Sequence, residues 1–180
     1  MSEAVVGIIG VVLGVILDRG VQWIEQGKEV KRQRQAVARA LLFETVSYYT
    51  YYYRYLRPIL NRLDTEHCPP PSLSVPSSDF FAVYRGNACF LGGFGHSVVE
   101  KVVRFYRLAE WLFTSIREYA WSLDRELERQ ENVATGSAPR RLLKQAQDLM
   151  YHTDTAAVEA IRTLSESAGV SYDSLRFNLS

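Results

Sequence analysis

The chain opens with a run of fourteen residues that carry no polar side chain, from Ala4 to Leu17. A membrane-spanning helix needs about 20 apolar residues, and the apolar side chains of residues 1–24 extend the run toward that length. No polar residue interrupts the circumference of a helix over this run, whereas a helix of a soluble bundle keeps a polar stripe. The pattern predicts a transmembrane helix over residues 1–24, with a buried or oligomeric soluble helix as the alternative.

The charges that flank the run predict its orientation. Six basic residues follow it within residues 18–39 and none precedes it, which also argues against a signal peptide. The positive-inside rule therefore predicts a single-pass protein of the plasma (inner) membrane, with the N-terminus outside and the bulk of the chain in the cytoplasm. The boundary between a membrane and the cytoplasm typically carries Trp at the interface, Arg side chains that extend toward water, and basic residues near anionic head groups. The predicted membrane-surface residues are Arg19, Trp23, Lys28, Lys31, Arg32 and Arg34.

Three glycines fall on one face of the predicted spanning helix: Gly7, Gly10 and Gly14. Gly10 and Gly14 have the GxxxG spacing that permits close approach of another membrane helix. One interpretation is a helix–helix contact in the membrane, with a second copy of the chain or with another protein. The other is that glycine is simply common in spanning helices.

After the apolar run comes a polar segment, and after that a segment whose apolar residues recur with the period of a helix. Residues 25–35 contain one apolar residue, Val30, and residues 25–36 are predicted to form a basic helical stalk. From residue 37 to residue 63 apolar residues recur at intervals of three, four and seven, which predicts an amphipathic helix. Pro58 predicts a kink near its end. Four prolines within residues 69–76 predict a loop over residues 64–77.

A short helix is predicted next, from Asp79 to about Arg85, with Ser77 or Ser78 as its N-cap and Gly86 at its end. It is followed by a turn-rich stretch of sequence NACFLGGFGH. This element lies within the long connection between the first and second long helices.

Two more long helices follow. Ser97 and Glu100 form a capping box before an apolar stripe that runs from Val99 to Leu127, about eight turns. After a loop over residues 131–138, a second stripe runs from Leu142 to Ala168, and Gly169 suits the C′ position after it.

Three long helices with one apolar stripe each predict an all-α fold, with an N-terminal transmembrane helix followed by a cytoplasmic three-helix bundle and one short extra helix. The predicted parts are the anchor (1–24), the stalk (25–36), the bundle (37–170) and a tail (171–180). The connection over residues 64–97 allows either direction of the second helix. If the first two helices are antiparallel, the 131–138 loop returns toward the membrane, and Arg140, Arg141 and Lys144 join the stalk in a basic collar.

The composition excludes several classes of protein but does not identify the function. The 180 residues are 47% hydrophobic and 23% charged, which fits one folded domain, and 21 basic against 20 acidic residues give a net charge of +1. Nucleic acid is therefore not a predicted partner. Two cysteines, Cys68 and Cys89, fit a reducing cytosol and exclude a disulfide-dense secreted scaffold. We expect no catalytic or cofactor-binding residues, because the sequence contains no catalytic constellation, P-loop or dinucleotide fingerprint. We expect no metal site, because His67 and Cys68 are adjacent and His96 lies seven residues from Cys89, which is not zinc spacing.

Glu44 is the one acidic residue on the apolar stripe of the first bundle helix, between Leu41 and Tyr48. A buried carboxylate needs a partner, and we predict that an Arg or Tyr of a neighbouring helix supplies one. A proton or metal site is the alternative, disfavoured because no Glu-x-x-His pair follows.

A tyrosine cluster fills six of the eight positions from 48 to 55. One helix face cannot hold all six, so some must point away from the core, and exposed tyrosine clusters are typical of protein contact surfaces. The alternative is packing of an unusually wide buried face. The predicted partner-contact residues are Tyr48, Tyr49, Tyr51, Tyr52, Tyr53 and Tyr55.

Two short motifs carry a resemblance to a known group. Leu41-Leu42-Phe43-Glu44 follows the pattern L-L-x-E-I, with Thr45 in place of isoleucine, and Val102-Val103-Arg104-Phe105-Tyr106 follows V-x-x-F-Y. Together with the N-terminal hydrophobic run and the basic stalk, they make residues 1–115 resemble a loose group of bacterial membrane-anchored helical proteins. The resemblance implies an anchor and a helical fold, and it implies no activity.

The sequence therefore favours a membrane-anchored, non-catalytic interaction protein, an accessory or scaffolding subunit of a larger membrane complex. The expected partners are membrane lipid and either other membrane subunits or a second copy. The alternative is a homo-oligomeric membrane effector or sensor that perturbs the bilayer.

Overall fold

The computed structural model describes the backbone of residues 2–63, 81–128 and 137–172, and the side chains of residues 25–63, 81–125 and 140–172. Every regular element in these residues is helical, which confirms the all-α prediction. The long elements are α1 (Ser2–Tyr51), α4 (His96–Glu128) and α5 (Ser137–Ala168). The short ones are the π-helical turn η1 (Tyr52–Leu56), α2 (Arg57–Leu63), α3 (Ala82–Asn87) and the 3₁₀ helix η3 (Ala88–Gly93).

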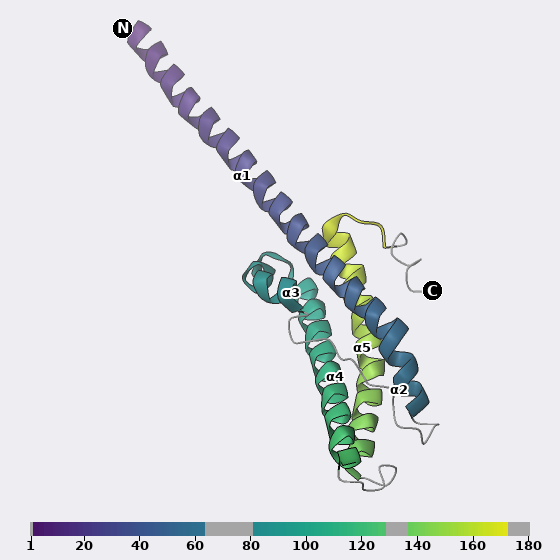
Figure 1. Cartoon of the computed structure of the whole chain (residues 1–180). Coiled ribbons are helices and arrows are strands. Elements are labelled where there is room, and N and C mark those ends of the chain that lie inside the picture. Colours follow the sequence, from purple (N-terminus) through teal and green to yellow (C-terminus); the bar gives the residue numbers. More distant parts are fainter. Residues whose placement is uncertain (1, 64–80, 129–136, 173–180) are drawn as a thin grey trace.

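The first helix, α1, belongs only partly to the bundle. It has 50 residues and is therefore about 75 Å long, and its N-terminal half projects alone beyond the other helices (Figure 1). Among the described side chains of α1, which begin at residue 25, the first buried ones are Val37 and Ala38. In the part of the chain that the structure describes, no helix is long and apolar enough to cross a membrane. The predicted transmembrane segment, residues 1–24, lies outside the described side chains.

The three long helices run in directions that the sequence left open. At one end of the bundle Arg39 Nε donates to the carbonyl oxygen of Ala168 (3.2 Å), and at the other Gln147 Nε2 donates to that of Leu60 (3.4 Å). α5 is therefore antiparallel to α1, and α4 runs parallel to α1 (Figure 1). The predicted basic collar required an antiparallel first pair and is wrong. Arg140, Arg141 and Lys144 are exposed at the end of the bundle far from the stalk.

The predicted stripes form the core. α5 contacts both α1 and α4 closely, and its buried face is rich in alanine, which lets the helix axes approach. Aromatic side chains fill the wider space between α1 and α4: the ring centroid of Tyr48 lies 4.8 Å from that of Phe81 and 6.0 Å from that of Phe113. The most deeply buried large side chains are Leu41, Leu56, Leu60, Phe105, Leu112, Ile116, Ile161 and Leu164.

The predicted start of α4 is wrong by two residues. α4 begins at His96, so Ser97 lies inside the helix rather than at its N-cap, and the Gly95 carbonyl accepts from the amides of Val98 and Val99 (2.9 and 3.2 Å). The predicted start of the short helix, position 79, lies outside the described residues. Phe81 is in a 3₁₀ turn, α3 begins at Ala82, and Phe81, its N-cap residue, offers no side-chain hydrogen bond. Ser77 and Ser78, the predicted caps, lie outside the described residues.

The predicted end of α5 is confirmed. Gly169 has φ 67°, the left-handed conformation that glycine adopts without strain. The Val170 amide donates to the Ser165 carbonyl (2.9 Å) and the Gly169 amide to the Glu166 carbonyl (3.2 Å), which together form a Schellman motif. Beyond it Val170 and Tyr172 pack on the core. Residues 173–180 lie outside the described part.

Candidate interaction surfaces

Glu44 joins three helices. Its side chain is 7% exposed, and each oxygen accepts from α3: Oε1 from the Val83 amide (2.8 Å) and Oε2 from the Tyr84 amide (3.0 Å). The Tyr106 hydroxyl of α4 donates to Oε2 as well (2.7 Å). The predicted tyrosine partner is therefore confirmed.

This carboxylate replaces the missing N-cap of α3. The amides of Val83 and Tyr84 are among the first four of the helix, which have no partner within it, and a negative charge there is also favoured by the helix dipole. The Tyr84 ring stacks on the Tyr106 ring at 4.0 Å between centroids. Burial raises the pKa of Tyr106, and the hydrogen bond to Glu44 raises it further. Glu44 thus fixes α3 on the bundle.

The two motifs that carried the resemblance meet at this point. Glu44 and Thr45 belong to the first motif and Phe105 and Tyr106 to the second, and the Tyr106 hydroxyl lies 2.7 Å from Glu44 Oε2 and 3.4 Å from Thr45 Oγ1. The geometry gives both motifs a structural role, in holding α1, α3 and α4 together. It contains no arrangement of nucleophile, acid and base.

The tyrosine cluster is divided between core and surface. Tyr48, Tyr49 and Tyr52 are buried, with 4%, 7% and 2% of their surface exposed. Tyr53 and Tyr55 are 38% and 62% exposed. The prediction that one face cannot hold all the tyrosines is confirmed. Tyr51 is half-buried, Tyr53 and Tyr55 lie at the surface, and the three core residues contribute packing.

A π-helical turn makes this division possible. Four-residue steps along an α-helix overshoot a full turn by about 40°, so buried residues spaced by four drift off the core face. Over Tyr52–Leu56 the helix widens, and the Arg57 amide donates to the Tyr52 carbonyl five residues earlier. The wider turn keeps Leu56 and Leu60 on the core face behind Tyr52. It lies just before Pro58, where the sequence predicted a kink.

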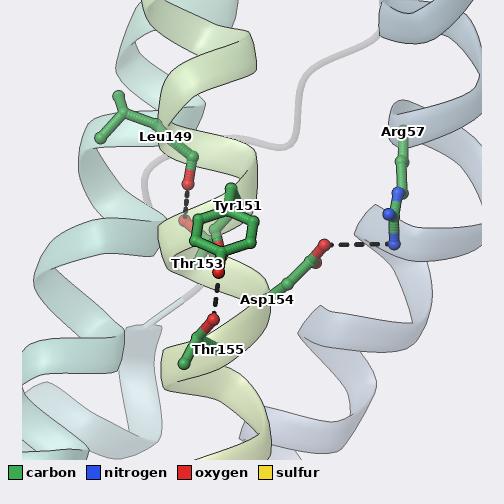
Figure 2. Close-up of polar contacts among 6 residues, drawn as sticks. All are labelled: Arg57, Leu149, Tyr151, Thr153, Asp154 and Thr155. Carbon is green, nitrogen blue, oxygen red and sulfur yellow. Dashed lines mark hydrogen bonds and ion pairs between the residues drawn. The ribbon is translucent and has the colours of Figure 1, made fainter.

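A partly buried ion pair lies near the hydroxyls of the buried residues Tyr49 and Tyr52. Arg57 Nη1 of α2 is 3.1 Å from Asp154 Oδ2 of α5 (Figure 2). Burial raises the pKa of Asp154, while Arg57 and the nearby hydroxyls of Tyr52 and Tyr49 act to lower it. Asp154 Oδ1 and the Tyr52 hydroxyl make no hydrogen bond within the described residues. The net upward shift means that the folded protein favours the neutral carboxyl more than the unfolded chain does.

Replacing Asp154 by Asn should make stability less sensitive to pH. A carboxyl with a raised folded-state pKa contributes most below its unfolded value of 3.8, and this contribution is lost as the pH rises through the folded value. We expect Asp154→Asn to gain stability relative to the parent as the pH rises above 3.8, measured by urea unfolding. Glu159→Gln is the control, because Glu159 forms only an exposed 3.7 Å pair with Arg104. A relative loss for Asp154→Asn over this range would contradict the assignment.

The basic stalk is exposed where it is described. Lys28, Lys31, Arg32 and Arg34 all have exposed side chains. Arg34 lies against η3, since a Cβ at Gly93 would be 3.3 Å from Arg34 Nε. The side chains of the other predicted membrane residues, Gly7, Gly10, Gly14, Arg19 and Trp23, lie outside the described part.

Two exposed tryptophans on α4 were missed by the sequence analysis. Trp111 and Trp121 are 53% and 61% exposed, and the guanidinium of Arg107 lies 5.3 Å from the Trp111 ring and that of Arg125 4.5 Å from the Trp121 ring. The available signal was their position, because both lie off the apolar stripe that otherwise defines this helix. Large aromatic residues with neighbouring arginines are typical of protein interfaces.

A surface groove of about 410 Å³ lies between α4 and α5 beside Trp111. It is lined by both basic and acidic side chains. Its lining residues are Trp111, Arg141, Lys144, Gln145, Asp148, Leu149 and His152. This mixture selects no single class of ligand.

The described residues contain no group of three or more His, Cys, Asp or Glu side chains that could hold a metal ion. No protein-family model, no curated protein and no solved structure matches this chain. The surfaces above are therefore interpreted from their own chemistry.

Proposed function

We propose that this chain is a membrane-anchored, non-catalytic interaction protein that serves as an accessory or scaffolding subunit of a larger membrane complex. The observation that carries the proposal is the continuity of α1 (Figure 1). One helix joins the apolar run of residues 4–17 to the bundle, and its N-terminal half extends past all other helices. An apolar segment in that position supports an anchor that holds the bundle away from the bilayer.

The stalk supports an inner-membrane location with the bundle in the cytoplasm. Its exposed basic residues follow the apolar run, and a Lys or Arg close to an anionic surface contributes about 1 kcal/mol to binding. The positive-inside rule then directs the short N-terminus outward. The resemblance to membrane-anchored helical proteins points in the same direction.

Two surfaces are proposed to hold the partner subunit. In the membrane it is the glycine face of Gly7, Gly10 and Gly14, where helix backbones can approach closely. In the cytoplasm it is the outward part of the tyrosine cluster, Tyr53 and Tyr55, with amphipathic rings suited to a protein contact.

Replacing both Gly10 and Gly14 by Leu should release the partner. We expect the variant to remain in the membrane fraction, because Leu is as apolar as the bilayer requires, but to be recovered without its partner subunits after mild detergent extraction. The mass of the intact assembly is the measurement. Val11→Leu with Val15→Leu is the matched control, with the same spacing on the next face of the helix, and should keep the complex.

Two results would count against this proposal. An unchanged assembly in the glycine variant would make the glycine face incidental. A native assembly that contains only copies of this chain and that permeabilises vesicles would instead favour the homo-oligomeric effector.

A further inference from the structure

The outer face of α4 carries a regular stripe of exposed residues. Its members recur at alternating intervals of four and three, which is the heptad spacing of a coiled-coil seam. At 100° per residue they lie on the side of the helix opposite its buried residues, such as Val102 and Ile116, and all are exposed. The stripe consists of Glu100, Arg104, Arg107, Trp111, Thr114, Glu118, Trp121 and Arg125.

The stripe is complementary to itself when its direction is reversed. If Trp111 faces Thr114 of a second copy in an antiparallel pair, Arg107 faces Glu118 of that copy. In the same register, Arg104, which also forms the exposed 3.7 Å pair with Glu159, faces the indole of Trp121 of the second copy. Glu100 then faces Arg125 at each end. Each pair of facing residues therefore joins opposite charges, a cation and an aromatic ring, or Trp and Thr.

Other registers lose this complementarity. A shift of one heptad in one direction places Arg107 opposite Arg125, and a shift in the other direction places Glu100 opposite Glu118. An unstaggered parallel pair would place every arginine opposite itself. Juxtaposed like charges disfavour each of these arrangements. Among the arrangements that close as a symmetric pair, the register that joins Arg107 to Glu118 is therefore favoured.

We propose that α4 pairs with α4 of a second copy of this chain, antiparallel, in the register that joins Arg107 to Glu118. Isologous pairing of this kind closes as a symmetric dimer. Because α4 runs parallel to α1, the two N-terminal helices leave such a dimer in opposite directions (Figure 1). The inference does not depend on the glycine face.

Reciprocal charge reversal tests the register. The full chain in a non-ionic detergent should give the protein mass of a dimer by light scattering. Arg107→Glu and Glu118→Arg should each weaken self-association on the order of a hundredfold, because each creates two like-charge contacts. An equimolar mixture of the two variants should recover the dimer mass, since each then meets its opposite charge. Unchanged circular dichroism shows that both variants fold.

The controls separate this contact from others. Arg140→Glu and Glu166→Arg reverse exposed charges on α5 and should leave the dimer intact. Gly10→Leu with Gly14→Leu should leave it intact as well, even if partner subunits are lost. A monomeric parent chain, a dimer that survives Arg107→Glu, or a mixture that stays monomeric would each overturn the proposal. Loss of the dimer in the glycine variant alone would assign self-association to the N-terminal helix and would also overturn it.

Discussion

Replacing Glu44 by Ala is expected to lower the free energy of unfolding by about 3 kcal/mol, because buried donors are left without an acceptor. The carboxylate accepts from two amides of α3 and from the Tyr106 hydroxyl, and it is 7% exposed. The short helix α3 has no other described side-chain cap. We therefore expect α3 to detach before the bundle unfolds, and the amides of Val83 and Tyr84 to lose protection in hydrogen exchange.

Two smaller changes calibrate this effect. Glu44→Gln keeps one acceptor oxygen and should lose about 1–2 kcal/mol, and Tyr106→Phe removes a single donor to a charged group and should lose about 1.5–3 kcal/mol. Glu166→Gln on the exposed side of α5 should change little. Urea unfolding measures all four. An alanine variant as stable as the parent, with its α3 amides still protected, would show that Glu44 does not hold this end of the bundle.

Alkaline unfolding is expected to be cooperative and to coincide with the ionisation of the core tyrosines. Burial raises the pKa of Tyr49 to about 12 and also raises those of Tyr48, Tyr52, Tyr106 and Tyr119 above the ordinary value of 10. A group with a raised folded-state pKa contributes stability that is present in full below its unfolded value. This contribution is lost as the pH rises through the folded value. Stability should therefore fall steeply above about pH 10.

The measurement is tyrosinate absorbance followed together with helical circular dichroism during a titration with base. The buried tyrosines, whose pKa values are raised, should ionise only as helix content is lost. Tyr55→Phe removes an exposed ring and should leave this joint transition in place, whereas Tyr49→Phe should reduce its amplitude. Complete ionisation of all tyrosines in a chain that keeps its helix content would contradict the burial described above.

The bundle could be predicted because each long helix has one apolar stripe with a regular period. The stripes after residue 37 became the buried faces of α1, α4 and α5. Local signals failed at α3, because its cap comes from Glu44, 39 residues before Val83 in the chain. They showed that the six tyrosines must divide between core and surface, but not which of them would be buried, since the π-helical turn depends on how the helix packs rather than on a residue pattern.

Helix direction could not be derived from the sequence for a physical reason. The connection over residues 64–97 is long enough to close a parallel or an antiparallel pair at similar entropic cost. The exposed tryptophans were visible as residues off the stripe, yet only their exposure and the arginines beside them separate an interaction surface from an imperfectly amphipathic helix. Similarly, the glycine spacing is compatible with a contact but does not identify the partner.

The most direct test of the central proposal is fractionation of the native membrane, followed by the mass of the intact assembly after mild detergent extraction. We predict that the chain stays with the membrane through a high-salt wash that removes electrostatic contacts. Detergent should then release it as a discrete complex with other subunits. Recovery of the chain in the soluble fraction without detergent would contradict the membrane anchor and with it the proposed function.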